Sequence, residues 1–147
     1  MAKPDEPSSS LDALAAWVIG AAIEVHRELG PGFGESIYEE ALSIELNERQ
    51  IPFTRQASLS IRYRSHVVGQ QRLDLLIDNL LIVELKSVEQ LIPLHQAQLL
   101  SYLKANGLTL GLLINFNVPV LKNGIRRVIL SPRSLGALCV LCALALN

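Results

Sequence analysis

The chain has 147 residues, half of them hydrophobic, and its mean hydropathy is +0.32. This size and composition predict a single domain with its own buried core, and they exclude a globally disordered chain. The formal net charge is −1, from 13 basic and 14 acidic residues. No global positive potential therefore favours nucleic acid, and any such contact depends on local patches.

The two ends of the chain differ from its middle. Residues 1–10, MAKPDEPSSS, predict a flexible N-terminal tail without a signal peptide. Residues 131–147 predict an apolar C-terminal extension, too short to span a bilayer, which packs on the domain, makes an oligomer contact or stays poorly ordered. Its two cysteines, Cys139 and Cys142, are more typical of buried thiols in a reducing cytoplasm than of a zinc or redox site. We therefore expect a cytoplasmic protein with one domain over residues 11–130.

Two helices are predicted in the first third of the chain. A capping-box pattern begins at Ser9, and apolar residues at helical spacing continue over residues 11–29, before a Gly-Pro pair that ends the helix. A second helix is expected over residues 35–49. The residues expected on its buried side are Ile37, Ala41 and Ile44, with Leu42 and Leu46 as further candidates.

Strand patterns dominate the rest. Alternating apolar and polar residues over 53–63 predict a half-buried strand, and a short strand is expected at residues 67–68. A proline and a glycine bracket a third helix over 93–107. The apolar run 109–115 is typical of a buried strand in a mixed sheet, and a last strand is expected over 125–130. This order of elements predicts an α/β fold with helices packed on a mixed sheet.

The strongest functional signal lies in residues 71–88, QRLDLLIDNLLIVELKSV. Two apolar runs flank an Asp-Asn pair, which predicts a β-hairpin. The apolar runs contain three charged residues, Asp74, Glu84 and Lys86, and the last two share one face of their strand. Burying such groups costs several kcal/mol per ion unless they are paired or bound to a metal. The segment is therefore interpreted as a site.

The register of this hairpin decides whether its two carboxylates meet. A two-residue loop would place Asp74 opposite Val83, on the face away from Glu84, because a shift of one residue reverses the side chain. A three-residue loop with a bulge, and with Asn79 in the left-handed region, places Asp74 on the face of Glu84. Asn tolerates that conformation well, so we expect the odd-numbered loop.

Two hard carboxylates beside a lysine fit metal-assisted hydrolysis of a phosphodiester. Asp74, Glu84 and the backbone carbonyl of Leu85 are expected to bind Mg²⁺ together with several waters, and Mn²⁺ is an expected substitute. Lys86 would orient the attacking water and offset the charge that develops on the phosphate.

The pattern D-x(9)-E-L-K that starts at Asp74 resembles the core triad of the PD-(D/E)XK nuclease superfamily. The upstream spacing Gly32-x-x-Glu35-x-x-Tyr38 is similar to the signature of its bacterial GxxExxY branch, and the resemblance extends over roughly residues 18–130. It implies a restriction-endonuclease-like fold, with a central mixed β-sheet flanked by α-helices. It also implies a Mg²⁺-dependent nuclease, with DNA as the expected nucleic-acid substrate.

The resemblance implies roles for further residues. Glu35 would lie near the metal, although the helix dipole alone also favours a glutamate in a first turn. Gln98 and Tyr102 resemble the Q-x(3)-Y element of RecB-like nucleases, which helps to position DNA. Leu73 stands where the superfamily usually has a proline, which removes no ligand, and His26 is expected on a helix surface. The expected substrate-binding residues are Gln98, Tyr102, Tyr38 and Arg72, and the expected catalytic residues are Asp74, Glu84, Lys86 and Glu35, with Glu35 also a metal ligand.

Two alternatives stay open. The same fold could be a catalytically silent module that binds nucleic acid or protein, although retention of the triad argues against this. In a purely structural reading, Glu84 and Lys86 form salt bridges and Asp74 caps the hairpin; stabilisation by added metal distinguishes this reading. A homodimer or another protein would supply any further binding surface, and substrate form and cleavage mode stay open. Other basic residues that could contact phosphate are Arg55, Arg62, Arg64, Lys104, Arg126 and Arg127.

Overall fold

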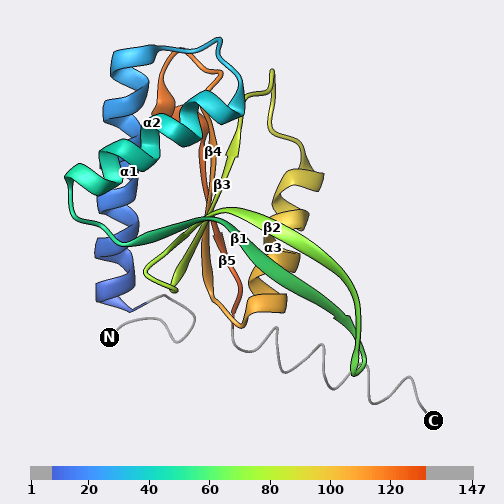
Figure 1. The fold of residues 1–147 in the computed structure, drawn as a ribbon. Coiled ribbons are helices and arrows are strands. Elements are labelled where there is room, and N and C mark those ends of the chain that lie inside the picture. Colours follow the sequence, from blue (N-terminus) through green and yellow to red (C-terminus); the bar gives the residue numbers. More distant parts are fainter. Residues whose placement is uncertain (1–7, 132–147) are drawn as a thin grey trace.

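The computed structural model describes residues 8–131, in which three α-helices pack on a five-stranded sheet (Figure 1). The N-terminal residues 1–7 and the extension from 132 onward, with Cys139 and Cys142, lie outside the described residues. The predictions for the tail, the extension and the domain limits therefore stay predictions. In chain order the elements are α1 (Ser9–Leu29), α2 (Glu35–Glu48), β1 (Phe53–Tyr63), β2 (His66–Ile77), β3 (Leu81–Lys86), α3 (Pro93–Asn106), β4 (Leu110–Asn115), η1 (Leu121–Gly124, a 3₁₀ helix) and β5 (Ile125–Ile129).

The strands lie side by side in the order β1-β2-β3-β4-β5, the same as their order in the chain. β3 and β4 are parallel, and the other three neighbouring pairs are antiparallel. Parallel neighbours need a crossover connection, which α3 provides. The predicted fold class, a mixed sheet flanked by helices, is confirmed.

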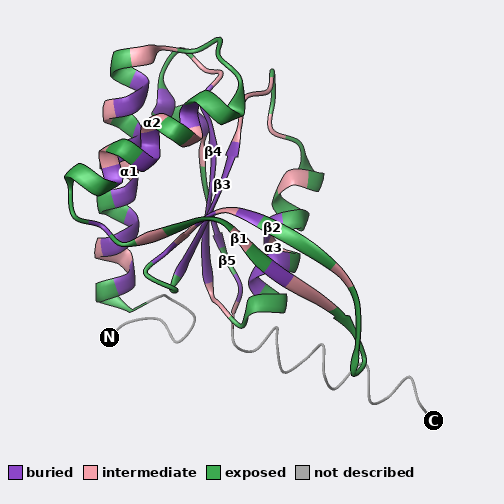
Figure 2. Ribbon diagram, viewed as in Figure 1, coloured by how far each residue is buried: buried purple, intermediate pink, exposed green. Residues whose placement is uncertain are grey.

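Each face of the sheet carries its own hydrophobic core. α1 and α2 cover one face, and α3 covers the other (Figure 1). β3 and β4 lie between the two layers and are almost wholly buried, which explains their continuous apolar sequences (Figure 2). The fully buried large side chains include Tyr38, Leu42, Leu46, Leu75, Ile77, Leu81, Leu85 and Phe116 on the first face, and Leu73, Ile82, Leu99 and Leu103 on the second.

The buried side of α2 is only partly the predicted one, because Leu42 and Leu46 are buried but Ile37 and Ile44 are not. Ile37 and Ile44 are 46% and 52% exposed, whereas Tyr38, Leu42 and Leu46 are fully buried. Both stripes have helical spacing, so periodicity alone did not separate them. The aromatic stripe is buried because the Tyr38 ring and its hydroxyl both find partners in the interior, which removes the cost of burying a polar group.

Two other features of the helices differ from the predictions. α1 begins at Ser9, and its N-cap is Ser8, whose Oγ accepts a hydrogen bond from the Leu11 N–H at 3.3 Å. The cap is therefore one residue earlier than the sequence pattern indicated. His26 is buried and not on the surface, because its Nε2 lies 2.8 Å from the Val118 carbonyl oxygen and forms a hydrogen bond with it.

β2 is also longer than predicted. The short strand at residues 67–68 and the strand of the hairpin are one continuous strand, β2. Its pairing with β1 shifts between Ile61 and Arg62, which face Gly69 and Val67, so that Val68 is an extra residue beside the glycine. This bulge allows the β1–β2 ribbon to bend without ending the strand. Within the described part of the chain, no helix is long and apolar enough to cross a membrane.

Candidate active site

A three-residue loop joins β2 and β3. Ile77 pairs with Leu81. Asp78 and Asn79 have positive φ angles of 50° and 56°. The predicted odd-numbered loop and the left-handed Asn79 are therefore confirmed. The Leu80 N–H donates to the Ile77 carbonyl at 2.9 Å while Ile77 pairs with Leu81, so Leu80 and Leu81 both oppose Ile77 at the end of the loop, as the predicted bulge requires.

This register brings the two strand carboxylates together. The last pair of β2 and β3 is Leu75 with Val83, so the same register places Asp74 opposite Glu84. Beyond this pair, side-chain carboxylates accept hydrogen bonds from the main-chain N–H groups of the opposite strand. The Asp74 N–H donates to Glu84 Oε1 at 3.3 Å, and the Leu85 N–H donates to Asp74 Oδ2 at 2.8 Å.

The carboxylate pair is electrostatically unfavourable. Burial raises the pKa of Glu84 to about 8, with the Asp74 charge as the second cause. Burial is also the main cause that raises the pKa of Asp74, and the charges of Glu39 and Glu35 add to it. Lys86, two residues along β3 from Glu84, lowers the pKa of both acids but does not outweigh these effects. The pair therefore favours a bound proton or a cation.

The main-chain carbonyl of Leu85 faces the same edge of β3 as its N–H. Along β3 the backbone groups of successive residues point alternately to β4 and to β2. The Lys86 carbonyl accepts a hydrogen bond from the Phe116 N–H on the β4 side, at 2.9 Å. The Leu85 N–H reaches Asp74 on the β2 side. Its carbonyl oxygen is thus placed on the edge where the carboxylates meet.

A pocket of about 290 Å³ opens beside Asp74 toward α2. Glu35, the first residue of α2, is exposed at its rim, and Glu39 lies one helical turn further. Glu39 raises the pKa of Asp74 more than Glu35 does. Glu39 was not predicted as a site residue, although its spacing of four residues from Glu35 places both on one helix face. The pocket is lined by Glu35, Ser36, Glu39, Gln56, Asp74 and Leu85.

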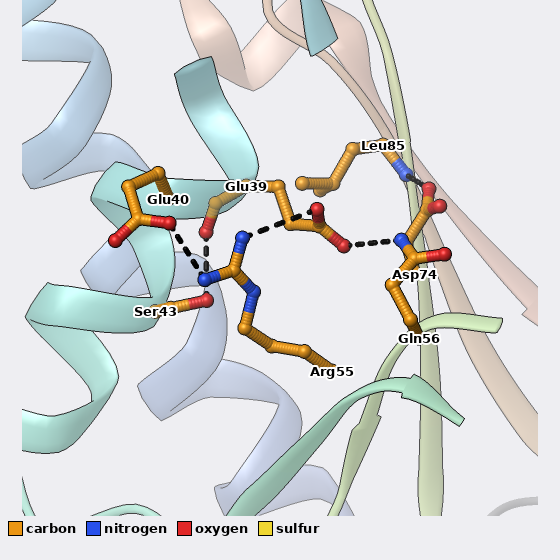
Figure 3. Close-up of polar contacts among 7 residues, drawn as sticks. All are labelled: Glu39, Glu40, Ser43, Arg55, Gln56, Asp74 and Leu85. Atoms are coloured by element: carbon orange, nitrogen blue, oxygen red, sulfur yellow. Dashed lines mark hydrogen bonds and ion pairs between the residues drawn. The ribbon is translucent and has the colours of Figure 1, made fainter. Parts of the chain in front are cut away.

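Glu39 is held by residues of β1 (Figure 3). Gln56 Nε2 donates to Glu39 Oε1 at 2.6 Å, and Arg55 bonds both Glu39, at 3.4 Å, and Glu40, at 2.6 Å. Arg55 was among the residues expected to contact phosphate, but these two glutamates engage its guanidinium. The network fixes an acidic wall opposite Asp74.

Comparison with known families identifies the fold. A family model described as the PD-(D/E)XK nuclease superfamily matches residues 12–128. The chain belongs to this superfamily. No curated protein and no solved structure gives a significant match. Superfamily membership explains the sheet and its flanking helices as a restriction-endonuclease-like fold and indicates a nuclease domain.

On the α3 side of the PD-(D/E)XK hairpin, the Gln98 and Tyr102 pair is in contact as the sequence spacing indicated. Gln98 Nε2 donates to the Tyr102 hydroxyl at 2.9 Å, and that hydroxyl donates to Gln71 Oε1 at 3.4 Å. Burial and then the Glu84 charge raise the pKa of Tyr102, so its ring lies near the carboxylate pair. Gln71 was not foreseen, because its contact depends on how β2 packs against α3.

Two of the expected substrate-binding residues occupy different environments. Tyr38 is fully buried: its hydroxyl donates to the Gly30 carbonyl at 2.6 Å and accepts from the Phe33 N–H at 3.2 Å, and its ring stacks on Phe116. Its position does not support substrate contact; the side chain holds the link between α1 and α2. Arg72, in contrast, is exposed on β2.

The oxygen atoms at the β2–β3 hairpin suit a hydrated metal ion better than a fully protein-enclosed one. Within residues 8–131, no three His, Cys, Asp or Glu side chains converge as a metal-binding cluster. Glu35 is therefore not part of a preformed set of three carboxylates. Asp74, Glu84 and the Leu85 carbonyl present hard oxygen atoms at one edge, which suits a cation that keeps several waters.

Proposed function

We propose that this PD-(D/E)XK protein is a cytoplasmic, Mg²⁺-dependent nuclease that hydrolyses phosphodiester bonds in DNA, and that it belongs to the GxxExxY branch. The observation that carries the proposal is the abutting pair of Asp74 and Glu84, whose raised pKa values make it costly without a positive partner. Mn²⁺ would substitute for Mg²⁺, because both cations accept carboxylate and carbonyl oxygens.

Asp74, Glu84 and the Leu85 carbonyl would hold the cation, and Glu35 would reach it through water. When bound, Mg²⁺ polarises the scissile phosphate and lowers the pKa of a coordinated water. Lys86 lowers the pKa of both carboxylates, so its ammonium lies within electrostatic reach of them. From there it would orient the attacking water and balance the negative charge of the transition state.

Tyr102 and Gln98 would form the α3 side of the substrate site, with Arg72 contacting backbone phosphate. The Gln98–Tyr102–Gln71 contacts hold the tyrosine ring beside Glu84. These rigidly held polar side chains would position a nucleic-acid strand for attack and leave the carboxylates free to bind the cation.

A cleavage assay on single-stranded, duplex and branched DNA, and on RNA, tests this function with Mg²⁺, Mn²⁺ or EDTA. Asp74→Asn and Lys86→Ala are expected to lower the rate at least about 100-fold. The matched controls, Glu89→Gln and Lys122→Ala, remove exposed charges away from the pair and should cut at the wild-type rate.

The melting temperature with and without Mn²⁺ separates the alternatives. Metal-dependent cutting that Asp74→Asn abolishes supports the nuclease. If the wild type neither cuts nor gains stability from metal, the proposal is wrong, and a silent binding module on the same fold replaces it.

A further inference from the structure

A second concave surface lies between α3 and β1, on the α3 side of the sheet. It has a volume of about 370 Å³, and we name it the Arg62–Lys104 groove. Each element contributes one cation and one hydroxyl group, and no carboxylate lines the groove. The lining residues are Ser60, Ile61 and Arg62 from β1, and Ser101, Lys104 and Ala105 from α3.

The two cations of this groove have no acidic partner among residues 8–131. No ion pair within that range involves Arg62 or Lys104. Two like charges around one concavity repel each other, and a bound anion would relieve that repulsion. Carboxylates do pair with the side chains of Arg27, Arg49, Arg55 and Arg127.

The groove lies along the elements that also form the candidate active site. On α3, Tyr102 is next to Ser101 and two residues before Lys104, so Tyr102 and Lys104 lie only about 3 Å apart along the helix axis. On β1, Arg62 is six residues beyond Gln56. At about 3.3 Å per residue this is roughly 20 Å of strand. Figure 1 shows α3 running alongside the β1–β2 ribbon.

We propose that the Arg62–Lys104 groove binds phosphate groups of a nucleic-acid backbone whose scissile bond lies at Asp74 and Glu84. The inference rests on the proposed function and adds a binding site outside the carboxylate pair. With one phosphate per about 3.4 Å of axis on each strand, the roughly 20 Å from Gln56 to Arg62 corresponds to at most about six nucleotides from the cut.

The chemistry of the groove favours a backbone over bases. A guanidinium contacts two phosphate oxygens at once, and an ammonium adds a point charge. The two serine hydroxyls are engaged within the protein, Ser60 with the Gln70 side chain and Ser101 with the Ala97 carbonyl, so the two cations make the phosphate contacts. Such contacts fix the position of a strand and carry no sequence information. A protein that uses this groove would bind nucleic acid without sequence preference.

The test measures binding of fluorescent 20-nucleotide single-stranded and duplex DNA in EDTA, by anisotropy at several salt concentrations. The double variant Arg62→Ala/Lys104→Ala is compared with Arg27→Ala/Lys122→Ala, which removes two exposed cations of α1 and η1. Groove binding predicts about a tenfold or larger loss of affinity at 0.1 M salt, and a salt slope smaller by about 1.4 to 1.8, for the first variant only. Melting temperatures establish that both variants are folded.

Two further measurements are needed. One distinguishes a nucleic-acid backbone from a small anion as the ligand, and the other separates groove binding from nuclease activity. Inorganic phosphate at constant ionic strength should not displace the DNA at low millimolar concentration; equal competition would overturn the proposal in favour of a small-anion site. Equal affinity of the two double variants, or no DNA binding by the wild type, would also overturn it. The cleavage assay of the wild type is read separately, so a failed groove and a failed nuclease give different results.

Discussion

The sharpest test of the site is Asp74→Asn in metal-free protein. At pH 8.5 the substitution removes one of two neighbouring carboxylate charges and keeps the shape of the side chain. The amide oxygen can still accept the hydrogen bond of the Leu85 N–H, and the amide nitrogen can donate to Glu84. We therefore expect the variant to be more stable than the wild type, and to lose the stabilisation that Mn²⁺ gives to the wild type.

The pKa of Glu84 sets the magnitude. Its rise from the ordinary 4.5 to about 8 is equivalent to at most about 5 kcal/mol of destabilisation when the group is ionised. Burial is the largest cause and the Asp74 charge the second. Removing the Asp74 charge should recover only the part of this destabilisation that the charge causes. We expect a gain of about 1–2 kcal/mol, or about 3–8 °C in melting temperature. Near pH 4 the gain should vanish, because Glu84, with a pKa of about 8, then holds a proton and no longer repels a charge on Asp74.

Urea unfolding at pH 4 and pH 8.5, in EDTA, measures the difference in the free energy of unfolding. Glu89→Gln is the matched control, because it removes an exposed carboxylate from the segment after β3 and should change stability little. A loss of more than about 1 kcal/mol for Asp74→Asn at pH 8.5 would refute the reasoning. It would mean that the Asp74 charge stabilises the hairpin, as the structural reading requires.

Other predictions address pH, the α1–α2 link and the turn before β5. The free energy of unfolding of metal-free wild type should fall as pH rises from about 4.5 to about 8, because folded Glu84 holds a proton that the unfolded chain releases; urea titrations across this range measure it. Tyr38→Phe should cost about 1–2 kcal/mol in the same assay, because the Gly30 carbonyl loses its buried donor. Gly124→Ala should cost more than about 2 kcal/mol, because the added Cβ would lie 2.2 Å from the Asn115 carbonyl oxygen; thermal melting against Gly69→Ala, where nothing lies within 4 Å, checks it.

The hairpin could be predicted in detail because its information is local. Strand parity links loop length to the face on which each side chain lies, so charged residues at positions 74 and 84 required a loop with an odd number of residues. The structure has that loop at residues 78–80. Two consecutive left-handed residues, Asp78 and Asn79, reverse the chain, and Leu80 is the extra residue that makes the loop length odd.

Features that depend on distant contacts could not be predicted in the same way. Whether the Ile37 face or the Tyr38 face of α2 is buried depends on Phe116. This residue lies far along the chain from α2, and its ring stacks on the Tyr38 ring with 4.4 Å between the ring centroids. The role of Glu39 depends on Arg55 and on where β1 passes α2. Periodicity identifies a helix and its candidate faces, but the face that is buried is chosen by the partner.

The opposite charges of the two regions separate binding from chemistry. Glu35, Glu39 and Asp74 form an acidic surface that repels a phosphate backbone until a cation binds. The Lys104 end of the Arg62–Lys104 groove lies within one helical turn of Tyr102, whereas Arg62 lies up to about 20 Å along β1 from Gln56, about twice the Debye length at 0.1 M salt. Salt therefore screens Arg62 from the acidic surface more than Lys104, and the attraction of the groove persists at its Arg62 end. If both proposals hold, a strand binds in EDTA through the groove but is cut only when metal is added. An affinity that instead rises steeply with metal would place the main phosphate contacts at the carboxylate pair.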